Sequence, residues 1–170
     1  MLIYLAAPIF TPQQLEVVEF IKTSCEAYHH EVFSPYHNST DIWQGRAPKD
    51  CSPAERRQVL DDNIRNIDWC DALLAWVGGM GGFTDPGVVW EMGYAFRGGK
   101  YTLCYIDPEM DAERQSMNLM LAGTVDSVIK DRGDLLAALS LMRDGQGDAL
   151  AEVTAVFPSS VLGQEAEPIV

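Results

Sequence analysis

Short apolar runs alternate along the chain with longer segments in which apolar residues recur every three or four positions. This alternation is typical of a parallel sheet whose strands are connected by crossover helices. The apolar runs predict five strands, over residues 2–6, 31–33, 72–77, 101–106 and 127–129. The helical spacing predicts helices over residues 12–29, 53–67, 87–97 and 135–142. We therefore expect an α/β fold with a doubly wound, flavodoxin-like or Rossmann-like sheet of about five parallel strands.

Three of these helices are preceded by side chains that commonly cap a helix. Thr11 and Ser52 each precede a proline, a residue that suits the first position of a helix. Ser52 is followed at the capping-box position by Glu55. Asp85 precedes the proline that opens the third predicted helix. The polar segment 34–53 is too long for a mere connection in a compact domain, so we expect it to contribute to function.

The composition is that of one globular domain with an acidic surface. Of the 170 residues, 47% are apolar, which is enough to fill a core. The 25 acidic and 12 basic side chains leave a formal charge of −13, so we expect neither nucleic acid nor a membrane surface as a partner. We expect one domain over residues 1–157, followed by a C-terminal tail over residues 158–170.

The sequence favours a soluble, cytoplasmic protein. No apolar stretch approaches the ~20 residues that a membrane-spanning helix needs. The apolar segment 1–10 lacks the basic start of a signal peptide and is predicted to hold a buried strand. The cysteines form no Cys-x-x-Cys pair, which favours a reducing compartment. They are Cys25, Cys51, Cys70 and Cys104.

The sequence lacks the common motifs for phosphate, dinucleotide and metal binding. A Walker A motif that ended at Lys100 would need glycine at position 94 and serine or threonine at position 101, where the chain has two tyrosines. No Gly-x-Gly-x-x-Gly pattern fits the glycine-rich segment 78–87. His29, His30 and His37 lack the spacing of metal ligands. We expect neither a metal nor an organic cofactor.

Two acidic residues stand out near the third predicted helix. Asp85 and Glu91 lie about one and a half turns apart, just after a predicted strand. Glu91 shares its helical stripe with the mostly apolar positions 87, 88, 94 and 95, so it is expected to face the sheet. A carboxylate there costs stability unless a site uses it, whereas Asp85 also suits a simple helix cap. The pair is suited to glycosidic chemistry, in which one acid engages the anomeric carbon and the other handles the leaving group's proton.

Tyr4 is a candidate for the same site. It lies in the first predicted strand, which the fold class places beside the third strand. Its hydroxyl is then in a position to hydrogen-bond Glu91 and orient the carboxylate. The alternative is a core aromatic residue with a satisfied hydroxyl, a role that strand position alone favours.

Four segments, taken in order, resemble the nucleoside 2-deoxyribosyltransferase family. Together they span most of residues 2–130. They are the run from Ile3 to Thr11, the helix and strand that begin with Asn63 to Asp71, the Asp-(x)5-Glu-x-Gly-Tyr-Ala run from Asp85 to Ala95 with Gly99-Lys100 after it, and Asn118-Leu119-Met120. The resemblance implies a nucleoside-processing enzyme.

The resemblance also implies roles for the matched residues. Glu91 stands in the place of the nucleophile, Asp85 in that of the residue that contacts the base or aids its protonation, and Tyr4 in that of the tyrosine that supports the glutamate. Asn118 and Met120 stand where family members reach into a neighbouring subunit's site. The chain is therefore expected to form a homo-oligomer built from dimers, with a hexamer as one possible form.

Three further residues are expected to contact the substrate. They are Phe10, Asn63 and Gly87. Asn63 stands where family members often carry an aspartate, so the contact with the base from that helix differs here. The expected substrates are a deoxynucleoside and a free nucleobase.

The function that these residues predict is the transfer of a 2-deoxyribosyl group from a deoxynucleoside to an acceptor nucleobase, in nucleoside salvage. The route is a covalent glycosyl-Glu91 intermediate. One alternative is a nucleoside 5′-monophosphate N-glycosidase of the same superfamily, which Asp85 disfavours because its charge would repel the phosphate. Another alternative is a nucleoside-sensing domain without catalysis.

Overall fold

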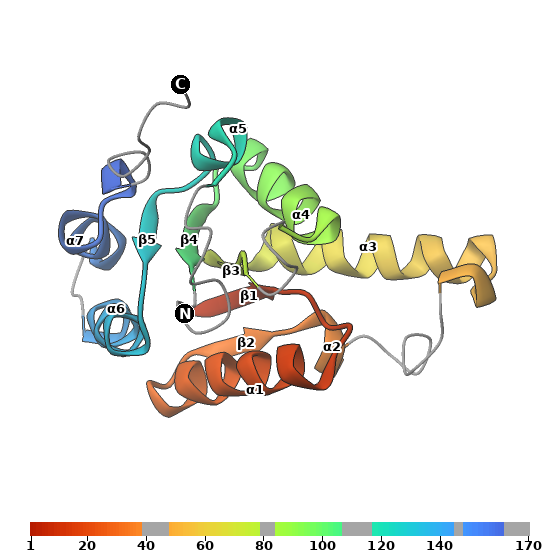
Figure 1. The fold of residues 1–170 in the computed structure, drawn as a ribbon, viewed down its shortest axis with the longest axis horizontal. Coiled ribbons are helices and arrows are strands. Elements are labelled where there is room, and N and C mark those ends of the chain that lie inside the picture. The colour runs from red at the N-terminus through yellow and green to blue at the C-terminus, as the bar shows by residue number, and fades with distance from the viewer. Residues whose placement is uncertain (39–47, 79–83, 107–116, 145–147, 162–170) are drawn as a thin grey trace, which may run out of the picture.

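The computed structural model, which describes residues 1–38, 48–78, 84–106, 117–144 and 148–161, is built around a five-stranded parallel sheet (Figure 1). The strands lie in the order β2-β1-β3-β4-β5. Their bounds are Leu2–Ala6 for β1, Glu31–Phe33 for β2, Ala72–Trp76 for β3, Tyr101–Tyr105 for β4 and Ser127–Ile129 for β5. This confirms the predicted fold class, and β3 and β4 each end one residue earlier than expected.

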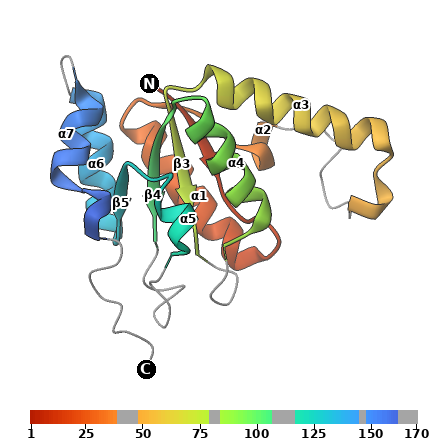
Figure 2. The same ribbon diagram turned by 90° about the horizontal axis from the view of Figure 1, so that it is seen from above.

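Helices cover both faces of this sheet (Figures 1 and 2). Helices α1 and α6 pack on one face, and α3 and α4 pack on the other, as in a doubly wound fold. The helices are α1 (Pro12–Ala27), α2 (Pro35–Asn38), α3 (Pro53–Trp69), α4 (Pro86–Arg97), α5 (Leu119–Ala122), α6 (Arg132–Asp144) and α7 (Ala149–Val156), with 3-10 turns at Pro48–Asp50 and Ser159–Val161. Among the described helices, none combines the length and the apolar character needed to cross a bilayer.

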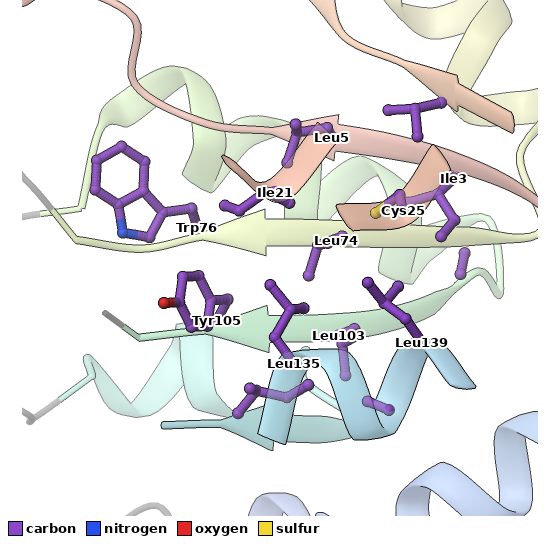
Figure 3. Close-up of a cluster of buried hydrophobic side chains, with 14 of the residues drawn as sticks. Ile3, Leu5, Ile21, Cys25, Leu74, Trp76, Leu103, Tyr105, Leu135 and Leu139 are labelled. Atoms are coloured by element: carbon purple, nitrogen blue, oxygen red, sulfur yellow. The ribbon is translucent and has the colours of Figure 1, made fainter. Parts of the chain in front are cut away.

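Alternate residues of the same strands supply the core on the two faces of the sheet. One cluster packs against α1 and α6, and Figure 3 shows Leu5, Leu74 and Trp76 from neighbouring strands within it. The other cluster packs against α3 and α4 and contains Tyr4 and Leu73, which face each other in register. Because side chains alternate along a strand, Tyr4 points to the face that α3 and α4 cover.

The predicted helix starts are confirmed by their caps. The side chain of Thr11 accepts a hydrogen bond from the backbone N–H of Gln14, and that of Ser52 accepts one from the N–H of Glu55. In both cases the side chain of the third helical residue also accepts from the cap's own N–H, so both are complete capping boxes. These caps mark where α1 and α3 begin.

The structure contains elements that the hydrophobic pattern did not predict. Helix α2 and the turn Pro48–Asp50 lie within the long polar segment 34–53, whose residues 39–47 are outside the described part of the chain. Helices α5 and α7 are also additional. Pro158, the first residue of the predicted tail, forms an antiparallel bridge with Ser127 of β5, and residues 162–170 are not described.

Candidate active site

Glu91 lies on the sheet-facing side of α4, as its position in the helix predicts. The buried stripe of this helix consists of Val88, Met92 and Ala95, and Glu91 lies next to it and is only partly exposed. Gly87, expected on the same stripe, is exposed. The helix therefore carries one carboxylate at the edge of an apolar contact with the sheet, where burial disfavours its charged form.

Tyr4 of β1 contacts this carboxylate directly. Its hydroxyl donates a hydrogen bond to Oε1 of Glu91 over 2.7 Å, and the tyrosine side chain is fully buried. Burial raises the pKa of Tyr4 far above its usual range, and the charge of Glu91 raises it further. Tyr4 therefore stays protonated and acts as a permanent donor to Glu91, which is the first of its two predicted roles and not the core role that strand position alone favours.

Asn63 of α3 is a second donor to the same carboxylate oxygen. Its Nδ2 donates to Oε1 of Glu91 over 3.5 Å. Its other amide atom, Oδ1, is buried and has no hydrogen-bond partner within the described residues. The sequence indicated Asn63 as a substrate contact but not as a partner of Glu91. The available signal was its spacing from Ile67, a buried residue one turn later on the sheet-facing side of α3.

The surroundings of Glu91 raise its pKa into the neutral range. Burial raises the pKa of Glu91 to about 7, the hydrogen bond from Tyr4 opposes this shift, and the charge of Asp85 adds to it. A carboxyl group with such a pKa is ionised in a large fraction of molecules at neutral pH, yet it is poorly solvated. These are the properties of a carboxylate that acts as a nucleophile or as a base.

Asp85 is the N-terminal cap of α4, the simpler of the two roles predicted for it. Its Oδ2 accepts a hydrogen bond from the N–H of Val88 over 3.0 Å. A Cβ atom at Gly87 would lie 2.7 Å from that same oxygen, so a larger residue there would require the Asp85 carboxylate to move from its place over the first turn. The charge of Asp85 also raises the pKa of Glu91. The cap and the electrostatic partner of Glu91 are therefore the same side chain.

The remaining predicted site residues lie outside this hydrogen-bonded group. Phe10 is 58% exposed in the loop after β1, which Gln14 clamps by accepting from the N–H groups of Phe10 and Thr11. Asn118 caps α5 by accepting from the N–H of Met120, and the Met120 side chain is 82% exposed. Within the described part of the chain, none of Phe10, Asn118 and Met120 hydrogen-bonds to Glu91. Gln14 was missed as a loop clamp, although its capping-box position was a usable signal.

No group of three or more His, Cys, Asp or Glu residues that could hold a metal ion occurs among the described residues. The described side chains around Glu91 are two carboxylates, a tyrosine and an amide. Such a set offers a nucleophile, a proton carrier and hydrogen-bond donors, all of which chemistry at a glycosidic carbon requires.

Comparison with known proteins identifies the family. The model of the family described as nucleoside 2-deoxyribosyltransferase matches residues 3–120. The chain belongs to this family. As a member of the nucleoside 2-deoxyribosyltransferase family, the chain is an enzyme that acts on nucleosides. The matched range contains Tyr4, Asn63, Asp85 and Glu91. A comparison with curated proteins finds no match.

Solved structures share the fold of this nucleoside 2-deoxyribosyltransferase family member. A 2-deoxyribosyltransferase from Bacillus psychrosaccharolyticus has a TM-score of 0.67 and 23% identity, with 88% of this chain and 96% of that chain covered. A conserved protein from Enterococcus faecalis V583 has a TM-score of 0.65 and 19% identity over 82% and 96% of the two chains. A CMP N-glycosidase from Clostridium botulinum has a TM-score of 0.54 and 18% identity over 83% and 98%. At these identities the likeness concerns the fold.

Proposed function

We propose that this protein transfers a 2-deoxyribosyl group from a deoxynucleoside to an acceptor nucleobase, with Glu91 as the nucleophile. The observation that carries the proposal is the partly exposed carboxylate of Glu91, whose Oε1 is held by the fully buried Tyr4 over 2.7 Å. Such a carboxylate is oriented by the sheet, and its pKa of about 7 leaves it ionised in a large fraction of molecules at neutral pH. The family match supports a nucleoside as the substrate.

The proposed reaction has two half-reactions. In the first, a carboxylate oxygen of Glu91 forms a bond to C1′ of the sugar while the C1′–N bond breaks, and the electron pair of that bond goes to the leaving base. The leaving base nitrogen takes up a proton from solvent, which Asp85 relays. In the second half-reaction the acceptor base attacks C1′, the bond to Glu91 breaks, and Asp85 relays to solvent the proton that the base loses. Two displacements at C1′ retain its configuration.

The chemistry of the sugar supports a 2-deoxyribosyl group. The transition state at C1′ has oxocarbenium character, and an electron-withdrawing 2′-hydroxyl destabilises it. A carboxylate approaching C1′ from the face opposite the base also meets any 2′-hydroxyl, because that hydroxyl lies on the same face. Both effects favour deoxynucleosides over ribonucleosides.

The hydrolysis of a nucleoside 5′-monophosphate is the second candidate, since one protein of similar fold is a CMP N-glycosidase. That reaction brings a phosphate dianion into a site that contains the carboxylates of Asp85 and Glu91. The charge of Asp85 is already felt at Glu91, and it would oppose the phosphate as well. Exchange between a nucleoside and a free base therefore fits the charges of the site better.

We further propose that the active form is a homo-oligomer in which Asn118 and Met120 complete a neighbouring subunit's site. The exposure of this short helix supports the proposal, since Leu119 is 86% and Met120 is 82% exposed. Two large apolar side chains in water at one helical turn suit burial against another copy of the chain.

The experiment that tests the function is a base-exchange assay. The protein is incubated with a deoxynucleoside and a different free base, and the new nucleoside is measured by chromatography. Parallel reactions replace the donor with its 5′-monophosphate or omit the acceptor base. We expect a new deoxynucleoside in the first reaction alone. Release of the base from the 5′-monophosphate without exchange would favour the N-glycosidase, and binding without any turnover would favour a sensing domain.

A further inference from the structure

The two oxygens of the Glu91 carboxylate lie in different surroundings. Oε1 accepts from Tyr4 over 2.7 Å and from Asn63 over 3.5 Å. These donors come from separate elements, Tyr4 from the sheet and Asn63 from α3, and they converge on the same atom. Within the described residues, Oε2 receives no hydrogen bond. The free oxygen is therefore the one with lone pairs available to a substrate.

We propose that Asn63 is a positioning residue that, together with Tyr4, holds Oε1 of Glu91. This proposal rests on the covalent route proposed above. By holding Oε1, Asn63 makes Oε2 the oxygen that bonds to the sugar, and it eases the later release of the sugar. In the glycosyl ester, Oε2 is bonded to C1′ and Oε1 becomes the carbonyl oxygen. Both donors then face a neutral carbonyl in place of a carboxylate.

The change of acceptor explains how Asn63 would act on the reaction. Hydrogen bonds to an ionised acceptor are roughly twice as strong as those to a neutral one. Tyr4 and Asn63 therefore stabilise the free carboxylate more than the ester. When the acceptor base attacks C1′, the electron pair of the C1′–Oε2 bond returns to the carboxylate. The negative charge spreads to Oε1, where the hydrogen bonds from both donors stabilise it. Without these donors the equilibrium shifts toward the glycosyl ester, and release of the sugar slows.

The amide of Asn63 also has a feature that a structural role does not explain. Its buried Oδ1 has no partner among the described residues, and such an acceptor costs folding free energy. Asn66, on the same helix, offers a contrast, because its Nδ2 donates to the backbone oxygen of Asp62 over 2.7 Å. A leucine at position 63 would remove the buried acceptor, whereas a leucine at position 66 would only remove a contact within the helix.

The test measures how much of the enzyme carries the sugar at equilibrium. Wild type, Asn63→Leu and the matched control Asn66→Leu are incubated with a deoxynucleoside and increasing amounts of its free base at about pH 8, where Glu91 is mostly ionised. Intact-protein mass spectrometry gives the glycosylated fraction. We expect Asn63→Leu to shift this equilibrium about tenfold toward the glycosyl-enzyme and to slow exchange by a similar factor. Asn66→Leu should leave the equilibrium unchanged.

A second variant keeps the test valid if leucine disturbs the fold. Within the described part of the chain, the groups that face Glu91 are Tyr4 from β1, Asn63 from α3 and Asp85 from the start of α4 itself. Asn63→Asp has nearly the same shape but places another negative charge beside Glu91, so the acid limb of the kcat/KM profile should move to higher pH. The acid limb of Asn66→Leu should not move.

The outcomes separate the two proposals. If wild type exchanges bases and forms the glycosyl-enzyme, but Asn63→Leu and Asn63→Asp leave both the equilibrium and the pH profile unchanged, the role of Asn63 is wrong and the function stands. If wild type forms neither a new nucleoside nor a glycosyl-enzyme, the proposed function itself is wrong. Urea unfolding of each variant completes the test, because a purely structural Asn63 predicts a loss of stability in Asn63→Leu, where we expect none.

Discussion

Replacing Glu91 with glutamine should abolish exchange and at the same time stabilise the protein. Glutamine keeps an oxygen that can accept from Tyr4 and Asn63, so the hydrogen bonds to this position need not be lost. It cannot ionise and is too weak a nucleophile to attack the sugar. The two effects have one cause, since the charge that the reaction needs is the charge that burial opposes.

The size of the stability gain follows from the pKa of Glu91. This pKa rises from 4.5 to about 7 on folding, which corresponds to about 3 kcal/mol between the two protonation states. Below pH 4.5 the carboxyl group is protonated in the folded and the unfolded chain, so it leaves stability unchanged. As the pH rises from 4.5 to about 7, the unfolded chain loses the proton while the folded chain retains it, and the wild-type protein loses stability.

The assay is urea unfolding of wild type and Glu91→Gln across this pH range. The difference in free energy of unfolding between Glu91→Gln and wild type should grow from near zero below pH 4.5 to about 3 kcal/mol in favour of the variant above pH 7, and then stay constant. Glu16→Gln, a change at an exposed glutamate of α1, is the matched control and should show no such growth. A variant that is less stable than wild type at high pH, or that still exchanges bases, would refute the reasoning.

Three further predictions concern the other parts of the site. Asp85→Asn should keep the helix cap, since asparagine caps as well as aspartate, but should slow base release. Because the charge of Asp85 raises the pKa of Glu91, its loss should also move the acid limb of kcat/KM to lower pH. A rate equal to wild type would show that Asp85 is only a helix cap. Deoxyinosine should react more than about a hundredfold faster than inosine, and equal kcat/KM values would contradict the deoxyribosyl assignment. Mixing inactive Glu91→Gln with inactive Asn118→Ala chains should restore part of the activity, and the absence of recovery after proven subunit exchange would argue for self-contained sites.

The contact between Tyr4 and Glu91 was predictable because it depends on two short periodicities. The alternation along β1 places Tyr4 on one face of the sheet, and the helical period of α4 places Glu91 on the side that covers that face. The doubly wound fold class places β1 beside β3, as the strand order shows. The local pattern and the topology together therefore predict this contact, and no knowledge of the packing distance is needed.

The contact between Asn63 and Glu91 was not predictable in this way. Asn63 lies on α3 and Glu91 on α4, and the approach of two helices on one sheet face depends on the sizes of the side chains between them. Nor does a pattern show which carboxylate oxygen a donor reaches. Helix α7 was missed for a different reason: it has only eight residues, and its buried side chains are Ala149 and Val153, too few to set a period.

The site's arrangement also explains why the nucleophile sits beside a buried stripe and not on the open side of α4. A carboxylate in water keeps a low pKa and strong solvation, both of which weaken it as a nucleophile. Burial beside Met92 raises the pKa of Glu91 to about 7, while the hydrogen bond from Tyr4 limits that rise and keeps the ionised form accessible. Without Tyr4 the group would remain protonated at neutral pH, and without burial it would be ionised but shielded by water. The sheet and the helix therefore set the reactivity of Glu91 by opposing effects, and Tyr4→Phe should raise the pH at which exchange begins.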